Sequence, residues 1–407
     1  MADAQQTGER IAYHRKRLGL SQVEFAGLIG RSDSWVSQVE RGVRAIDRLS
    51  VFQKVADVLS VPVAELRGAD PDEAEAADRP EALEALRFTL TGHPAIRTVL
   101  GEKSQALAAA RLDELQSQRT DVWEMVHAAQ YFELAAYAST VIPELENAVR
   151  AESSAETGRA TRELLTNTYQ AVAAILARLG EADAAWIAAD RATFIAETLA
   201  EPLEVAASLY RMTHAFLTLS QIGQAQIVAT TVVSELEQQS TQDPSMGTMS
   251  LCGAFHLVLA IAAARSDDRA QAHQHLDRAK EIADRIGGDR DDFGTEFGAT
   301  NVALHAVAVA VELGDAGQAL DLARYIEPSA LSLERQARYA LDLAQAHVMR
   351  RQTGEALRCL EQAERLTPEQ TRTHRVARAV VRDLIQLSGS RPRPELRELA
   401  ERLGVLP

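Results

Sequence analysis

Cysteine is scarce in this sequence of 407 residues, and no long apolar run is present. The two cysteines, Cys252 and Cys359, are distant from each other and belong to no metal-ligand spacing, which predicts core packing in a reducing compartment. The longest apolar run extends only from Leu257 to Ala264, whereas roughly 20 residues are needed to span a bilayer. No basic leader with an apolar stretch opens the chain. We therefore expect a cytoplasmic protein that does not contact a membrane.

The sequence also lacks the short motifs that carry common catalytic chemistry. It has no glycine-rich phosphate loop, no nucleophile elbow and no pair of histidines with a glutamate at metal spacing. His273 and His275 are two positions apart on an expected helix, so they point to different faces. The acidic stretch Asp289–Asp292 lacks the glutamate that a calcium loop needs at its twelfth position, where Thr300 stands. These absences argue against an enzyme, and they predict neither a cofactor nor a bound metal.

Charge is distributed unevenly along the chain. Residues 1–67 hold ten Lys or Arg and eight Asp or Glu, whereas the remainder holds 33 and 50. A near-neutral to basic head can approach a polyanion, and the acidic body would be repelled by it. Residues 68–80 form a short acidic stretch without apolar periodicity, which we interpret as a linker. We therefore predict one domain at 1–67 and a second at 81–407.

A capping signal predicts a short helix near the amino terminus. Ser21 is followed three residues later by Glu24, a capping box that starts a helix at Gln22. Gly30 can adopt the positive φ that ends it.

A second short helix follows this turn. Either Ser32 or Asp33 can cap its start, and Gly42 closes it. At helical spacing, Val36 and Val39 lie inward. Three polar residues point outward, namely Ser34, Ser37 and Gln38. Two short helices joined in this way, one of them with a polar outward face, are typical of a segment that contacts DNA.

These residues form a motif that resembles a known family. The motif consists of Leu20-Ser21-Gln22, Phe25-Ala26, Gly30, Val36-Ser37 and Val39-Glu40-Arg41-Gly42. With it, the sequence from Gly8 to Leu66 resembles the Cro/repressor-type (XRE) helix-turn-helix domain and is expected to form five helices. The three further helices are expected at Glu9–Arg17, at Asp47–Leu59 and from Pro62 to about Leu66. Their expected core residues are Ile11, Leu18, Phe52, Val55, Ala56 and Leu59.

The resemblance implies which side chains meet DNA. Those expected at base edges are Asp33, Ser34 and Gln38, and those expected near phosphates are Gln22, Ser37 and Arg41. Arg31 and Arg44 are also expected to contact DNA, and Arg31, which departs from the family pattern, is expected to reach a phosphate. The amide of Gln38 can donate and accept together, which matches the edge of adenine. The carboxylate of Asp33 only accepts, so a helix-capping role is an equal alternative for it. Arg31 and Trp35 depart from the family pattern, and Trp35 is expected to pack on the neighbouring helix, with contact to a sugar as the alternative.

Beyond the linker, the helical pattern is almost uninterrupted, and its turns resemble one another. The similar turns are Leu179–Ala185, Ser266–Ala272, Leu313–Ala319 and Arg351–Ala356. They resemble the punctuation of the tetratricopeptide repeat, which implies an all-α solenoid of about seven helical hairpins. The hairpins are expected to begin near Ser104 and to end in a capping helix at Pro394–Leu403. Stacked hairpins of this kind form a right-handed superhelix whose first helices line a concave binding wall.

Alignment of the turns places polar and aromatic residues on that wall. They can hydrogen-bond a peptide backbone or a small polar molecule, and the simpler alternative is that they are solvated and bind no ligand. His256 has apolar neighbours and is expected to be buried rather than to contact a ligand. The candidate effector-binding residues are Asn167, Gln170, Tyr210, Arg211, His214, Asn301, His305, Arg338, Asp342 and Gln345.

The combination of the two parts resembles cytoplasmic regulators that include the peptide-pheromone receptors of quorum sensing. The stretch from Tyr131 to Leu145 is also similar to regulators of high-GC bacteria. The resemblance implies a transcriptional regulator that binds an inverted-repeat operator as a homodimer and responds to a peptide or small signalling molecule. Two alternatives stay open, because the repeats can instead serve as a docking platform for a partner protein or as a dimerisation scaffold.

Overall fold

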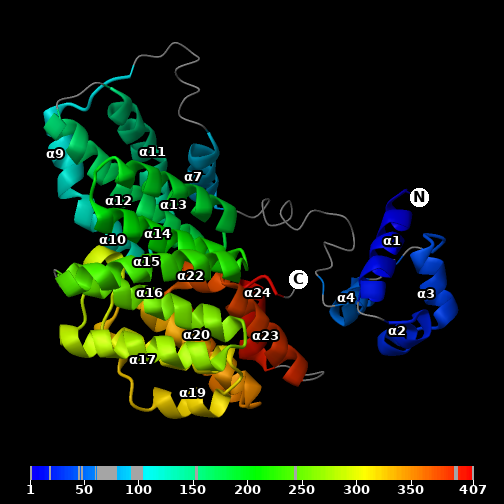
Figure 1. Ribbon diagram of the computed structural model, residues 1–407. Coiled ribbons are helices and arrows are strands. Elements are labelled where there is room, and N and C mark those ends of the chain that lie inside the picture. The colour runs from blue at the N-terminus through cyan, green and yellow to red at the C-terminus, as the bar shows by residue number, and fades with distance from the viewer. Residues whose placement is uncertain are drawn as a thin grey trace. The chain divides into compact units, whose positions relative to one another are not determined.

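The computed structural model contains two compact units, Met1–Glu81 and Ala82–Pro407, and both are built from helices (Figure 1). Within the described part of the chain the only extended pairing is a single antiparallel bridge between Arg290 and Phe297. The predicted all-α class is therefore confirmed. The structure describes residues 2–17, 20–44, 46, 49–59, 61, 80–92, 104–151, 155–242, 245–388 and 393–405.

The amino-terminal unit packs four described helices around one apolar core. These helices are α1 (Ala2–Arg17), α2 (Gln22–Ile29), α3 (Asp33–Glu40) and α4 (Leu49–Leu59). The core residues are Ile11, Phe25, Ala26, Ile29, Val36, Val39, Val55, Ala56 and Leu59. The first helix was expected to begin at Glu9, but it begins at Ala2. Several predictions lie outside the described residues, namely those for Leu18, residues 47–48, the side chain of Phe52, the helix from Pro62 and most of the linker.

Local capping chemistry fixes both ends of α2. Ser21 Oγ accepts a hydrogen bond from the backbone N–H of Glu24 at 3.2 Å, and the Glu24 carboxylate accepts one from the N–H of Ser21 at 2.8 Å. Gly30 follows the helix with φ 67° and ψ 41°, a left-handed conformation that costs glycine little. The predicted capping box and the predicted end of the helix are both confirmed.

The start of α3 shows which of Ser32 and Asp33 caps this helix. Ser32 caps the helix, because its Oγ accepts from the N–H of Trp35 at 3.2 Å. Asp33 is the first residue of the helix, so the capping role considered for it is wrong. The helix ends at Glu40, and Gly42 then adopts a φ of 68°.

The larger unit is a stack of helical hairpins in which consecutive helices pack against each other (Figure 1). The helices before the main stack are α7 (Glu81–Thr91), α9 (Ala109–Ser117), α10 (Arg119–His127) and α11 (Tyr131–Arg150). The hairpins are α12 (Ala155–Leu179) with α13 (Ala182–Glu197), α14 (Pro202–Thr218) with α15 (Ile222–Gln242), α16 (Met246–Arg265) with α17 (Arg269–Ile286), α18 (Ala299–Glu312) with α19 (Ala316–Ala323), and α20 (Leu333–Met349) with α21 (Thr353–Leu366). The last helices are α22 (Pro368–Thr373), α23 (Arg375–Ser388) and α24 (Pro394–Arg402), and the short 3₁₀ turns are η1 (Asp292–Gly294) and η2 (Pro328–Ala330).

The four similar turns share one backbone conformation. Each contains a residue with positive φ, and a fully buried alanine follows five positions later. The left-handed residues are Gly180, Asp267, Gly314 and Arg351, with φ of 84°, 57°, 79° and 57°, and the alanines are Ala185, Ala272, Ala319 and Ala356. The same turn at the same phase gives each hairpin the same packing face. This regularity explains why the turns could be recognised in the sequence.

The stack bends until its early helices meet its late ones. The carboxylate of Glu369 on α22 accepts hydrogen bonds from the N–H groups of Tyr131 and Phe132, at 2.9 and 3.1 Å, and thereby caps α11. Arg178 at the end of α12 forms an ion pair with Glu334 on α20, with Nε and Oε1 3.0 Å apart. The first helices therefore face a buried polar interior.

Helix α16 lies in the centre of a large apolar core formed by α14 to α18. It is the only helix in the described ranges that is long and apolar enough to cross a membrane, and 83% of its apolar window is buried inside the unit. Packing between α15, α17 and α18 accounts for its apolar composition.

Candidate DNA-contacting helix and inner wall of the helical domain

The predicted DNA-contacting residues lie on α3 and its two flanks. Asp33 and Ser34 are exposed at the start of the helix, and Ser37 and Gln38 are half-buried one turn later. Ser34 and Gln38 share one face because they are four residues apart. Arg31, Arg41 and Arg44 are exposed beside this helix, and they supply positive charge at both of its ends.

Two side chains that depart from the family pattern contact each other. The guanidinium of Arg31 lies 5.5 Å from the centre of the Trp35 ring, within the range of a cation–π contact. Trp35 is half-buried and packs against the apolar core of the amino-terminal unit. The structure thus supports packing as the role of Trp35, and it leaves Arg31 at the surface.

A buried ion pair joins α1 to the last residue of α3. Arg15 on α1 donates from Nε and Nη2 to the two carboxylate oxygens of Glu40, at 2.6 and 2.9 Å, and their side chains are only 8% and 6% exposed. Gln22 donates from Nε2 to the same carboxylate at 2.7 Å. The amide expected to approach a phosphate is therefore held by Glu40 in this structure. Sequence reasoning missed this network, although Glu40 belongs to the motif.

The ten wall residues all lie on the first helices α12, α14, α18 and α20. Half of them are buried and the others are half-buried, so the alternative that they are solvated does not hold for the buried half. Their binding of an effector stays a prediction. The buried residues are Gln170, Tyr210, Arg211, Asn301 and Asp342, and the half-buried ones are Asn167, His214, His305, Arg338 and Gln345.

The wall binds a segment of the chain itself. Residues 287–298 connect α17 to α18, and we call them the insert; residues 287–291 are exposed, whereas residues 294–298 are buried. Arg211 donates from Nη2 to the carbonyl oxygens of Phe293 and Gly294, at 2.5 and 3.0 Å. Asn301 donates from Nδ2 to the next two carbonyls, at 3.4 and 2.9 Å, and Arg335 Nη2 donates to the first of these at 3.3 Å. Four consecutive carbonyl oxygens, from residue 293 to residue 296, are thus held by side chains of three helices.

Side chains of the insert strengthen this attachment. The Glu296 carboxylate accepts from the N–H and Oγ of Ser332, at 2.9 and 2.8 Å, and lies 3.4 Å from Arg335 Nε. The Phe297 ring is fully buried and packs on Gly253 of α16, where a side chain would overlap it. Sequence reasoning considered the insert only as a failed calcium loop and missed both Glu296 and Arg335.

Arg211 is a buried cation of this interior. Its guanidinium lies 4.6 Å from the Trp123 ring centre and 5.0 Å from that of Tyr210, and its buried Nε has no hydrogen-bond partner among the described residues. Burial lowers the pKa of Arg211 to about 10, so it remains charged near neutral pH. Burial and the charge of Arg211 also hold the pKa of His214 well below its usual value, which keeps that ring neutral. The site can therefore accept an anionic group beside Arg211.

Other wall residues form separate contacts. Gln170 donates to Ser208 Oγ at 3.0 Å, within the α12–α14 interface. Arg338 lies 3.0 Å from His374 Nε2 and 3.7 Å from the carboxylate of Asp342. Burial raises the pKa of Asp342 to about 6. Gln170 and the Arg338–Asp342 pair thus make contacts away from the insert, whereas Arg211 and Asn301 are the two predicted residues that bind it.

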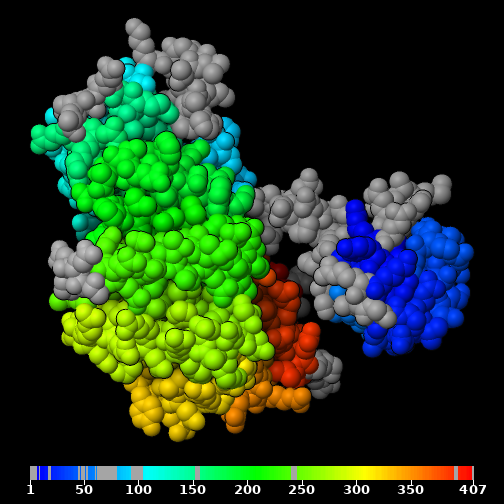
Figure 2. Space-filling model, viewed as in Figure 1, coloured from blue at the N-terminus to red at the C-terminus, as the bar shows by residue number. Residues whose placement is uncertain are grey.

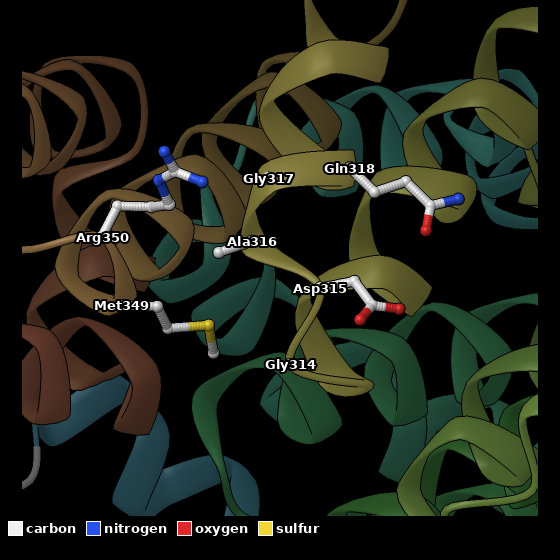
Figure 3. Close-up of a pocket in the computed structure, with 7 residues that line it drawn as sticks. All are labelled: Gly314, Asp315, Ala316, Gly317, Gln318, Met349 and Arg350. Carbon is white, nitrogen blue, oxygen red and sulfur yellow. The ribbon is translucent and has the colours of Figure 1, made fainter.

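A surface hollow lies elsewhere, at the turn between α18 and α19. It has a volume of about 480 Å³ and is lined by Gly314–Gln318 together with Met349 and Arg350 (Figure 3). Its side chains do not converge on one point, since those of Gln318 and Arg350 point apart. The face of the helical unit in Figure 2 shows the helices from α12 to α17 as a closely packed surface. We therefore assign the candidate site to the inner wall rather than to this hollow.

Comparisons with known proteins agree with the description of the amino-terminal unit. A family model described as a helix-turn-helix domain matches residues 6–69, and no curated protein matches the chain. Among solved structures, the chain is similar to Bacillus thuringiensis PlcR in complex with the peptide PapR7 and DNA, with 15% identity, coverage of 70% of this chain and 96% of that chain, and a TM-score of 0.29. It is also similar to ComR from Streptococcus suis, with 12% identity, coverage of 72% and 94%, and a TM-score of 0.20. The capped α2–α3 pair and this family match identify residues 6–69 as a helix-turn-helix domain of the Cro/repressor type.

Proposed function

We propose that this chain is a transcriptional regulator that binds an operator through α3 and is modulated by a peptide effector on the inner wall of its helical unit. The observation that carries the effector half is the set of bonds from the wall to the carbonyl oxygens of residues 293–296. Side chains that bind the backbone of one segment can bind that of another. The effector would replace the insert in this position.

The chemistry of the wall indicates the kind of peptide. Arg211 has a buried Nε–H without an acceptor among the described residues, and Arg335 already faces the carboxylate of Glu296. A peptide with a carboxylate, from an acidic side chain or from its own terminus, can satisfy both cations. The wall then has two states, one with the insert bound and one with the insert displaced. An effector that binds only the second state shifts the population toward it, to the extent of its difference in affinity for the two states.

The DNA half rests on the geometry of α3. Its outward residues Ser34 and Gln38 are on one face, and exposed arginines flank the helix at positions where phosphates lie in such complexes. We propose that two chains act together, because two heads of a homodimer match inverted half-sites about 34 Å apart.

A binding experiment with natural extracts tests the effector half. Binding of purified full-length protein to a selected duplex is followed by fluorescence anisotropy, with and without a heat-stable, low-mass fraction of culture filtrate. We expect the fraction to change the affinity of the parent protein and to have a strongly reduced effect on Arg211→Met. Arg324→Met is the matched control, because Arg324 is an exposed arginine that directly follows α19. This variant should respond as the parent does.

Each outcome has a clear reading. Equal responses of the parent and Arg211→Met would refute the inner wall as the effector site. A response only to a protein fraction would indicate a docking platform instead, and no response to any fraction would indicate a scaffold. Circular dichroism of both variants, recorded first, verifies that each one retains the helical content of the parent.

A further inference from the structure

Three side chains that the proposed function does not use gather where α15 and α16 meet. Cys252 and His256 are four residues apart on this helix, and Glu237 approaches them from α15. One ligand atom from each of the three lies within 4.8 Å of the other two. Cys252 and His256 are 3% and 5% exposed, so two of the three groups are withdrawn from water.

The two ring nitrogens of His256 have different surroundings. Its Nδ1 lies 3.1 Å from Nδ1 of His275 on α17, so one of these nitrogens donates to the other. Its Nε2 is buried without a hydrogen-bond partner among the described residues, and it lies 3.7 Å from Glu237 Oε1. Burial and the neighbouring His275 lower the pKa of His256 to about 4, which keeps the ring neutral. When Nδ1 carries the proton and donates to His275, Nε2 presents a free lone pair to Cys252 and Glu237.

We propose that Cys252, His256 and Glu237 form a binding site for a single transition-metal ion, with Zn²⁺ as the best match. A thiolate, an imidazole and a carboxylate are all common zinc ligands, and three protein ligands leave a fourth position for water. His275 is a positioning residue, because its bond to Nδ1 fixes the tautomer that coordinates through Nε2.

The geometry requires only a small adjustment. Zinc bonds of about 2.0–2.3 Å place tetrahedral ligand atoms about 3.3–3.8 Å apart. The Glu237–His256 distance of 3.7 Å already lies within this range, and all three atoms lie within 4.8 Å of one another. Rotation of the Cys252 and Glu237 side chains supplies the remaining movement.

Charge balance is also favourable. Metal binding displaces the thiol proton of Cys252 to solvent, so the thiolate and the Glu237 carboxylate together neutralise the dication. In the metal-free protein burial raises the pKa of Cys252 to about 12, and the thiol is protonated. Arg278 donates to Glu237 at 3.0 Å and to Glu281 at 2.7 Å, so it retains an acidic partner when Glu237 turns toward the metal.

The site joins three consecutive helices of the stack. Glu237 belongs to α15, Cys252 and His256 to α16, and the supporting His275 to α17. Gly253, next to Cys252, is the residue on which the Phe297 ring of the insert packs. A bound ion therefore stiffens the helix that receives the insert, and the thermal midpoint of the protein should rise with metal.

Cobalt is the direct probe, because Co²⁺ replaces Zn²⁺ and reports a thiolate ligand by a charge-transfer band. Full-length protein freed of metal by chelation is titrated with CoCl₂ and then with ZnCl₂. We expect one Co²⁺ per chain, a thiolate-to-cobalt band, and bleaching of that band by zinc. Cys252→Ser should lose the band, whereas Cys359→Ser, at the other free cysteine, should retain it.

Histidine variants test the positioning role. His275→Ala should keep the band but weaken cobalt affinity by about 10- to 100-fold, as expected for loss of a group behind a ligand. His273→Ala, two residues away on the same helix, should behave as the parent. His256→Gln, included in case the serine variant fails to fold, should also lose the band. Absence of the band from the parent, or its persistence in both Cys252→Ser and His256→Gln, would overturn the proposal.

Discussion

Replacement of Gly253 by alanine tests whether the insert is held by close packing. A Cβ at this position would lie 2.5 Å from Cε1 and Cε2 of Phe297 and still closer to Cζ. The ring is fully buried, so it cannot move aside within the core. The alanine must therefore displace the ring, and the insert should loosen.

The size of the effect follows from the cost of overpacking. An additional methyl group in a well-packed site costs about 1–3 kcal/mol. When this cost is relieved by release of the insert, the opening equilibrium shifts by about 5- to 150-fold. The affinity for an effector that replaces the insert should rise by up to the same factor.

Hydrogen exchange measured by mass spectrometry provides the assay. Peptides that cover residues 290–297 should exchange faster in Gly253→Ala, because the Arg290 N–H bonds to the Phe297 carbonyl at 2.9 Å and Glu296 N–H bonds to Asp291. Gly223→Ala on α15, where a Cβ meets nothing within 4 Å, controls for the general effect of alanine in a helix. Unchanged exchange of the insert, or equal acceleration throughout the helical unit, would refute the reasoning.

Three further predictions concern the head and the interior. Glu40→Ala leaves the buried Arg15 guanidinium without its carboxylate, so it should destabilise the amino-terminal unit by about 3–5 kcal/mol. Hydrogen exchange of α3 peptides, measured at increasing urea concentration, gives the unfolding midpoint of this unit, and an unchanged midpoint would contradict the prediction. Gln38→Ala should weaken operator binding by about 1–3 kcal/mol and relax one base position, whereas Arg41→Ala should weaken binding to all duplexes and lower the salt slope by about 1; parental titrations for both variants would exclude the proposed docking. Burial lowers the pKa of His305 to about 4, whereas the unfolded ring takes up its proton near 6.5, so stability should fall as pH falls through this window. The drop in thermal midpoint from pH 7 to pH 4.5 should be smaller in His305→Gln, and an equal drop would show that this ring does not contribute.

Features set by neighbouring residues could be predicted from the sequence. The capping box of Ser21 and Glu24 and the left-handed Gly30 depend on local backbone chemistry, and both occur as expected. The turns of the stack were recognisable because each places a left-handed residue five positions before a buried alanine. Alignment of these turns also identified the wall residues, which all lie on the first helices of the hairpins. The extension of α1 to Ala2 carried no comparable signal in the sequence. The close packing of Gly8 on the backbone of Val39 and Glu40 is also a contact between segments that are distant in the sequence.

Features set by long-range packing could not be predicted in this way. The position of the insert depends on Arg211, which lies more than 80 residues away from Phe293 and Gly294. The closure of the stack depends on Glu369, whose partner Tyr131 is 238 residues away. Neither contact has a local pattern, so the wall was expected to be open, whereas it is filled by the chain itself.

Selection of binding sites from random duplexes tests the central claim most directly, namely that α3 reads a sequence and the helical unit presents two heads. Purified full-length protein should enrich an inverted repeat whose half-sites lie about one turn of duplex, roughly 34 Å, or a multiple of it apart. Gln38→Ala should enrich the same repeat with one position of each half-site relaxed. Enrichment of no sequence over random competitor, or an identical motif from the parent and the Gln38 variant, would contradict the account.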